Sequence, residues 1–135
     1  MSKAVFQSGI SWRVVDAKWP GIREAFRNFQ PLAVASLTGK EMEELANDKR
    51  VIRNRRKLDA IVDNARQMLD LEEQHGSFQR YLRSHGDFEG CVADLRKRFR
   101  FLGDTGCYYF LWVVGEKVPD YDAWRASRGL APMAH

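Results

Sequence analysis

Residues 94–115 read "DLRKRFRFLGDTGCYYFLWVVG", and this stretch decides the fold. Its two ends each have the apolar spacing of a helix, and the glycine-bearing segment "FRFLGDTG" (residues 99–106) separates them. We expect Phe101 and Leu102 to pack inward and Gly103 to make the sharp bend. The stretch therefore predicts two helices that meet in a hairpin.

The bend of this hairpin is a candidate phosphate site. The amides of Asp104, Thr105 and Gly106 stand at the start of the second helix, where helical geometry offers no carbonyl partner. Free amides and the helix dipole together suit one phosphate of a nucleic-acid backbone. Basic side chains just before the bend would contact neighbouring phosphates: Arg96, Lys97, Arg98 and Arg100. The alternative is an ordinary corner between two helices with a solvated basic face.

Helical signals run along the rest of the chain, and no stretch alternates convincingly as a strand. The predicted class is all-α, a compact helical bundle. Pro20 suits the first turn of a helix that reaches Phe29 and stops at Pro31. Cap residues predict where the other helices begin. Thr38 and Glu41 form a capping box, and Asn54 begins the longest helix, which ends at Gly76. The remaining predicted caps are Ser77, Asp87 and Asp120. No repeat or linker divides the chain, so residues 1–135 are expected to form one domain.

Composition places the chain among ordinary globular proteins. Its residues are 44% apolar and 30% charged with only 4 prolines, which excludes the disordered class. No tract reaches the ~20 apolar residues of a membrane span, and no secretory signal opens the sequence, so a cytoplasmic location is expected. Cys91 and Cys107 lack metal-ligand spacing and are interpreted as buried apolar side chains rather than a disulfide or metal ligands.

The positive charge favours an anionic partner. The net charge is +4, and a second basic group runs from Lys49 to Lys57 at the mouth of the longest helix. Cations there oppose the helix dipole, so a bound anion would explain them, and Arg55 and Lys57 are taken as candidate DNA contacts. A solvated charged surface is the alternative.

Four blocks of the sequence together resemble the DNA-3-methyladenine glycosylase I family. They are "FQSGISWRVV" (residues 6–15), "FRNFQPLAVA" (26–35), "VIRNRRKLDAIVDNAR" (51–66) and "LRKRFRFLGDTGCYYFL" (95–111). The resemblance covers roughly residues 4–115. It implies an all-α helix-hairpin-helix glycosylase that binds duplex DNA through the hairpin, flips out an alkylated purine and hydrolyses its N-glycosidic bond in base excision repair. The phosphate-binding turn would then be residues 102–106.

The resemblance also implies a base pocket. Trp12 matches the family's base-stacking tryptophan, and cation–π attraction would favour a cationic alkylated base. Gln7 and Ser11 flank it and are available for hydrogen bonds. A tryptophan in an apolar stretch is alternatively a core residue. No Schiff-base lysine follows the hairpin, because Thr105 occupies its approximate position, so lyase activity is not expected.

A catalytic carboxylate is expected about twenty residues beyond the hairpin in the wider superfamily. Asp120 and Asp122 fall near that spacing, and either would stabilise an oxocarbenium-like sugar or orient water. Both would alternatively serve only as cap and first-turn acid of the last helix.

The sequence departs from the family at several positions. The position of the family's pocket acid falls at about Ala4. The family's zinc ligands have no counterparts, and Tyr121 stands about where one of these ligands would be, so no metal or other cofactor is expected. Asp104 would repel a bound phosphate by about 4 kcal/mol at ~4 Å and an effective dielectric near 20. The chain resembles a relative shortened at its N-terminus. A non-catalytic helix-hairpin-helix DNA-binding protein is therefore the alternative function.

Overall fold

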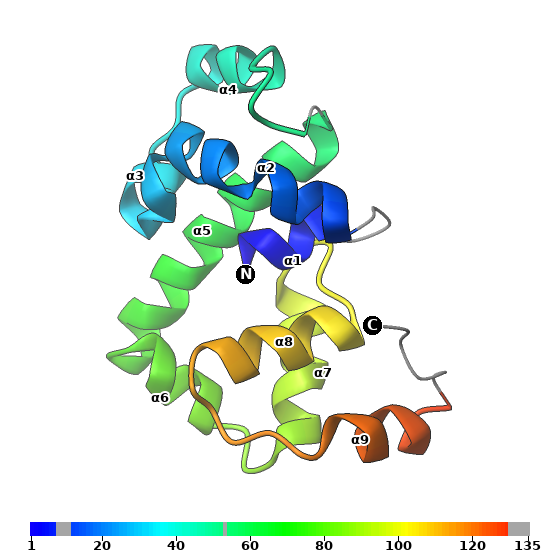
Figure 1. The fold of residues 1–135 in the computed structure, drawn as a ribbon. Coiled ribbons are helices and arrows are strands. Elements are labelled where there is room, and N and C mark those ends of the chain that lie inside the picture. Colours follow the sequence, from blue (N-terminus) through cyan, green and yellow to red (C-terminus); the bar gives the residue numbers. More distant parts are fainter. Residues whose placement is uncertain (8–11, 53, 130–135) are drawn as a thin grey trace.

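A computed structural model describes residues 1–7, 12–52 and 54–129, and the side chain of Trp12 lies outside the described part. Every regular element in these ranges is helical, which confirms the predicted class. Helix α5 (Arg55–His75) runs through the molecule, with α1 to α4 around its first half and α6 to α9 around its second half (Figure 1). We call these groups the N-terminal lobe and the C-terminal lobe.

The N-terminal lobe contains five elements, of which α1, α3 and α4 contact α5 directly. They are α1 (Ser2–Gln7), α2 (Trp12–Ala25), the 3-10 turn η1 (Arg27–Phe29), α3 (Pro31–Ala35) and α4 (Gly39–Ala46). Their apolar faces enclose a first core that includes the fully buried side chains of Phe6, Ile22, Phe26 and Leu58. Removing these side chains from water is the main force that holds the short helices to α5.

The C-terminal lobe has its own core. It contains α6 (Phe78–Arg83), α7 (Phe88–Arg98), α8 (Asp104–Val113) and α9 (Tyr121–Ser127). Leu71 of α5 and Leu95 of α7 are fully buried in it. Cys91 and Cys107 lie in the same core as free, buried thiols, which confirms their interpretation as small apolar side chains.

The predicted cap residues begin their helices as expected. The Thr38 hydroxyl and the Glu41 carboxylate exchange both bonds of a capping box at α4. Gly76 ends α5 with a left-handed φ of 87°. Four further side chains each accept a bond from the amide three residues later: Asn54, Ser77, Asp87 and Asp120. Local capping chemistry therefore fixes most helix starts.

The two predictions that depended on proline are wrong. Pro20 lies inside α2, which begins at Trp12 and ends at Ala25, and Pro31 begins α3 instead of only ending a helix. Between them, Arg27, Asn28 and Phe29 have φ values of 55°, 58° and 54°, a conformation that costs roughly 1 kcal/mol or more for each such residue. Tertiary packing overrides local preference in this turn.

The bend of the hairpin also differs from expectation. Gly103 has a φ of −90° and serves as the N-terminal cap of α8, while the left-handed residue is Phe101, with a φ of 55°. Leu102 is buried as predicted, and Phe101 packs against the first core. The turn is therefore held by burial of its aromatic residue and not by glycine alone.

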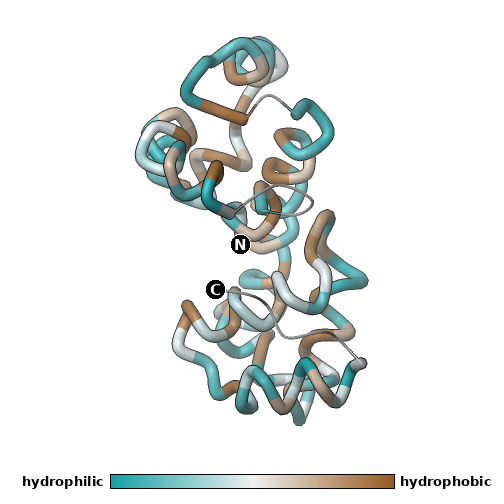
Figure 2. The backbone as a smooth tube through the Cα atoms, turned by 45° about the vertical axis from the view of Figure 1, so that its right-hand side comes forward, coloured by the Kyte–Doolittle hydropathy of each residue, from teal (hydrophilic) through white to brown (hydrophobic). Residues whose placement is uncertain are grey.

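The lobes meet at the N-terminal helix. Figure 2 shows the N-terminal residues at the level where the two groups of helices adjoin. Helix α1 contacts α5, α2 and α8, so it belongs to the packing of both lobes. None of the helices in the described ranges is long and apolar enough to cross a membrane.

Candidate active site

A cleft of about 580 Å³ lies between the lobes. Its walls come from α1, α2, η1 and α3 on one side and from the C-terminal end of α8 on the other, with α5 beneath them. Five of the lining residues are aromatic: Trp19, Phe29, Tyr109, Phe110 and Trp112. Concave, largely apolar sites with a few polar groups are typical of small-molecule binding.

Gln7 is the predicted base-binding residue that the structure brings to this cleft. It is the last residue of α1, and Ala4 lines the cleft one turn before it. Ser11 and the Trp12 side chain lie outside the described part, although Trp12 is the first residue of α2. Their roles in base binding stay predictions.

The cleft contains a carboxylate that sequence reasoning missed. Asp16 of α2 lines it and forms an ion pair with Lys3 of α1, with 2.8 Å between Oδ1 and Nζ. The signal was present in the sequence, because Asp16 follows Trp12 by four residues and α2 therefore places both positions on one face. Asp16 therefore brings a carboxylate to the cleft from α2, the helix that follows the one carrying Ala4.

Asn64 joins the cleft to the hairpin. Its side chain lines the cleft, is 4% exposed, and forms two hydrogen bonds with the backbone of Arg100. The Asn64 amide nitrogen donates to the Arg100 carbonyl at 3.1 Å, and its amide oxygen accepts from the Arg100 N–H at 2.9 Å. One buried side chain of α5 therefore fixes the turn beside the cleft.

The hairpin also approaches α1 closely. A side chain added at Gly106 would place its Cβ 3.2 Å from Leu102 Cδ1 and 3.5 Å from the Cβ of Ala4. Glycine lets the first turn of α8 pack this near the cleft wall. The predicted phosphate turn and the cleft are therefore neighbours.

The first amides of α8 are available to a ligand. Among the described residues, no acceptor pairs with the amides of Asp104, Thr105 or Gly106, and the first amide with a carbonyl partner is that of Cys107, which donates to Gly103 at 2.9 Å. This is the open helix terminus that the sequence predicted.

The Asp104 carboxylate does not stand alone beside these amides. Arg96 Nη1 lies 3.0 Å from one oxygen and Arg128 Nη1 lies 3.1 Å from the other. Arg125 of α9 donates to the Thr105 hydroxyl at 3.1 Å. Asp104 thus pairs with two guanidinium groups, which offset the repulsion expected from its carboxylate.

Two predicted phosphate contacts are partly exposed on the hairpin. Arg98 pairs with Asp94 at 2.8 Å and Arg100 pairs with Asp63 at 2.6 Å. Their side chains remain 42% and 46% exposed. Exposed pairs of this kind are weak, so both guanidinium groups can exchange a carboxylate for a phosphate.

The second basic group is arranged differently from expectation. Lys57 is 4% exposed, and its Nζ donates to the Phe6 carbonyl at 3.1 Å at the end of α1. Burial lowers the pKa of Lys57. A buried ammonium that caps a helix is not available to DNA, so the predicted contact has no structural support.

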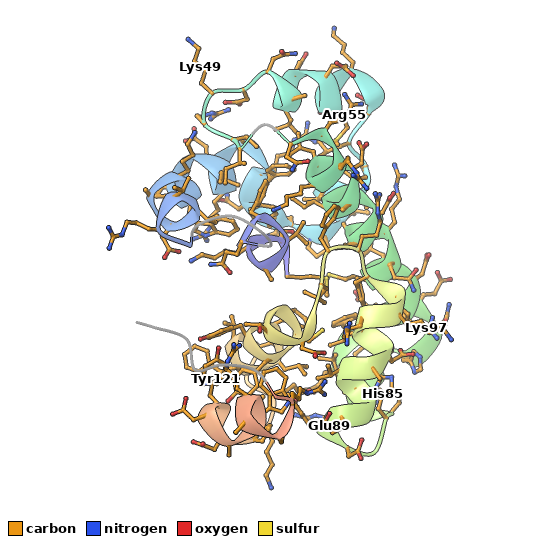
Figure 3. All side chains as sticks on the ribbon, turned by 90° about the vertical axis from the view of Figure 1, so that its right-hand side faces the viewer. Lys49, Arg55, His85, Glu89, Lys97 and Tyr121 are labelled. Atoms are coloured by element: carbon orange, nitrogen blue, oxygen red, sulfur yellow. The ribbon has the colours of Figure 1, made fainter. Side chains whose placement is uncertain are left out.

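Arg55 lies in the upper part of the molecule in Figure 3, whereas Lys97 of the hairpin helix α7 lies in the lower half. It is paired with Glu43 and with Asp59, the latter at 3.2 Å. Its contact with DNA stays a prediction, separate from the hairpin surface.

The predicted catalytic aspartates lie on α9. Asp120 accepts from the Ala123 amide at 3.0 Å as the cap of that helix, and Asp122 is exposed in its first turn. Neither is among the described residues that line the cleft. The observed role of Asp120 is structural, and catalysis by either residue stays a prediction.

No three histidine, cysteine, aspartate or glutamate side chains gather at one point within the described ranges. A second hollow of about 680 Å³ lies beside α7 and residues 115–119, and none of the predicted site residues lines it. Glu116 in that hollow is paired with Arg83 at 3.1 Å. The interlobe cleft is therefore the candidate site.

Comparisons with known proteins identify the family and agree with the all-helical fold. The family model of methyladenine glycosylase matches residues 2–96. The chain is 32% identical to the DNA-3-methyladenine glycosylase of Haemophilus influenzae and 31% identical to DNA-3-methyladenine glycosylase 1 of Escherichia coli. Each match covers 81% of this chain and 70% of the relative.

Solved structures show the same similarity. The 3-methyladenine DNA glycosylase I of Staphylococcus aureus superposes with a TM-score of 0.71 at 27% identity, covering 82% of this chain and 70% of that one. A variant of 3-methyladenine DNA glycosylase I in complex with 3-methyladenine gives a TM-score of 0.70 at the same identity and coverage.

Proposed function

Because this chain belongs to the methyladenine glycosylase family, we propose that it is a monofunctional DNA glycosylase that removes alkylated purines from duplex DNA. The observation that carries the proposal is the adjacency of the aromatic cleft to the open amides of α8, joined through Asn64. A flipped nucleotide can then enter the cleft while the hairpin holds its strand. We further propose that residues 1–135 act as one domain in the cytoplasm.

The chemistry asked of the protein is modest. An N3-alkylated adenine in DNA is positively charged, so the bond between N9 and the sugar carbon C1′ is already weak. As that bond breaks, its electron pair neutralises the base, while a water oxygen forms the new bond to C1′ and gives up one proton, to a carboxylate or to solvent. The protein needs to hold the cationic base against aromatic faces and to exclude bulk water.

Trp12 and Gln7 are the proposed base contacts, and residues 102–106 with Arg98 and Arg100 are the proposed backbone contacts. Contacts to phosphates position the protein without reading sequence. Because they release counterions, binding to duplex DNA should weaken steeply as salt rises. Asp122 is the better candidate for the catalytic carboxylate, because Asp120 is engaged as a cap.

The test is release of free 3-methyladenine from methylated duplex DNA, measured by chromatography. Wild type should release the base, and Trp12→Ala should lower the rate by at least tenfold. Val14→Ala is the matched control, because Val14 is exposed on the same helix and does not line the cleft. Absence of base release from wild type, or equal release by wild type and Trp12→Ala, would count against the enzyme.

One observation favours a second function. Ala4 lines the cleft at the position where the family has its pocket acid, which is consistent with a DNA-binding protein that has lost catalysis. That protein would bind duplex DNA with strong salt dependence and release no base. Neutralising Arg98 and Arg100 together should reduce its affinity and the slope of its salt dependence.

A further inference from the structure

A positive charge already occupies part of the cleft. Lys3 Nζ lies 2.8 Å from Asp16 Oδ1 and 5.4 Å from the centroid of the Trp19 ring. All three residues line the cleft, Lys3 from α1 and the other two from α2. An ammonium group is thus held between a carboxylate and an indole, the two kinds of group that attract a cation.

The indole of this site is held rigidly. Trp19 stacks on Phe29 with 5.2 Å between ring centroids and 7° between planes. Phe29 stacks in turn on the fully buried Phe26 at 5.0 Å and 10°. The three consecutive left-handed residues of η1 include Phe29, so a strained turn supplies the ring that supports Trp19. Strain of this kind persists where packing fixes a geometry, and here it fixes an aromatic wall.

The ammonium that fills the site is exchangeable. The side chains of Lys3 and Asp16 are 42% and 56% exposed, and pairs this exposed contribute little stability. Within the described part of the chain, Asp16 has no other ion-pair partner. A lysine side chain is long and flexible, so it can leave the carboxylate when another cation arrives.

We propose that Asp16 and Trp19 form a subsite for the positive charge of an alkylated purine, and that Lys3 occupies this subsite when the cleft is empty. This inference rests on the proposed function, because it takes the cleft as the site of the base. Asp16 then supplies, from α2, the negative charge that Ala4 cannot supply from α1. The pair would select a cationic base over a neutral one of similar shape.

The test uses two small probes with the intact chain. The 3,9-dimethyladeninium ion keeps the positive charge of the alkylated nucleotide, and 9-methyladenine is its neutral counterpart. Their binding is measured by NMR titration for wild type, Asp16→Asn, Lys3→Met and the control Lys18→Met. Lys18 is exposed on α2 and does not line the cleft. Circular dichroism and urea unfolding establish that each variant is folded.

The charged probe should bind wild type more tightly than the neutral probe. Asp16→Asn should weaken binding of the charged probe about fivefold and leave the neutral probe unchanged, since one exposed charge pair is lost. Lys3→Met should strengthen binding of the charged probe about threefold, because the competing ammonium is gone. Lys18→Met should behave as wild type.

Three results would overturn the subsite: no measurable binding of the charged probe to wild type, an equal effect of Asp16→Asn on both probes, or weaker binding of the charged probe to Lys3→Met. Base release from methylated DNA is measured separately. If wild type releases the base and Asp16→Asn keeps the preference for the charged probe, the subsite is wrong and the glycosylase stands. If wild type releases no base and the preference depends on Asp16, the glycosylase is wrong and the subsite stands.

Discussion

Truncation of Asn64 to alanine tests the link between the cleft and the hairpin. The change removes two hydrogen bonds to the Arg100 backbone, at 3.1 and 2.9 Å. Each bond contributes about 1 kcal/mol net, and a buried backbone group left unpaired costs a further ~1–3 kcal/mol. The bonds are only partly buried and Arg100 is exposed, so water will replace part of the loss. We expect Asn64→Ala to lower the free energy of unfolding by about 2 kcal/mol.

Urea unfolding followed by circular dichroism measures this loss. Asn47→Ala is the matched control, because the Asn47 amide donates a single exposed bond to the Glu43 carbonyl at 2.9 Å. That control should lose less than about 1 kcal/mol. A loss below roughly 0.5 kcal/mol for Asn64→Ala, or equal losses for the two variants, would refute the argument that Asn64 fixes the turn.

The same variant has a functional readout that differs from stability. At low temperature and without urea, Asn64→Ala should be almost entirely folded, since native domains have about 5–15 kcal/mol in reserve. Its α8 amides would nevertheless be less well positioned, so affinity for duplex DNA should fall severalfold. If the folded but destabilised variant binds DNA with unchanged affinity, the hydrogen bonds to Arg100 do not contribute to DNA binding.

Three further predictions concern charge and thiols. Asp104→Asn removes a carboxylate beside the open amides and frees Arg96, while Arg128 keeps its pair with Glu89. Affinity for duplex DNA in fluorescence anisotropy should therefore rise by up to about fivefold at low salt, and weaker binding would contradict this. Burial raises the pKa of Cys91 to about 11 and that of Cys107 to about 12. Neither thiol should therefore react with a disulfide reagent at neutral pH until urea unfolds the chain, and a rapid reaction of the native protein would disprove their burial. Burial of Asp94 alone would raise its pKa, but three side-chain donors outweigh burial and hold the pKa below the ordinary 3.8. The resulting stabilisation is present above pH 3.8 and is lost as the pH falls through the lower folded-state pKa. Asp94→Asn should therefore make the unfolding free energy depend less steeply on pH in acid.

The sequence predicted the parts of the fold that depend on neighbouring residues. Thr38, Asn54 and Asp87 begin helices because their side chains accept from amides three residues away, and that chemistry is visible in the sequence. Pro20 was misplaced because proline is compatible both with a first turn and, at a cost, with a helix interior. Only packing against the first core decides between these positions.

The candidate site was predictable to a smaller extent. Gln7 could be predicted as a site residue because it belongs to a recognisable block of sequence, and it lines the cleft. Lys57 looked like surface charge, since lysine is rarely buried, and its bond to the Phe6 carbonyl depends on how α1 lies against α5. The pairing of Asp16 with Lys3 joins two helices and has no local signature.

The continuity of α5 through both lobes limits how a damaged nucleotide can be taken up. This helix has 21 residues, or about 30 Å at 1.5 Å per residue, and both cores pack on it. The two lobes share this continuous helix, so they cannot move apart unless α5 itself bends. The width of the cleft between the lobes is therefore fixed before DNA binds. The distortion that lets a nucleotide enter the cleft must come from the DNA duplex, which deforms most easily at a damaged base pair.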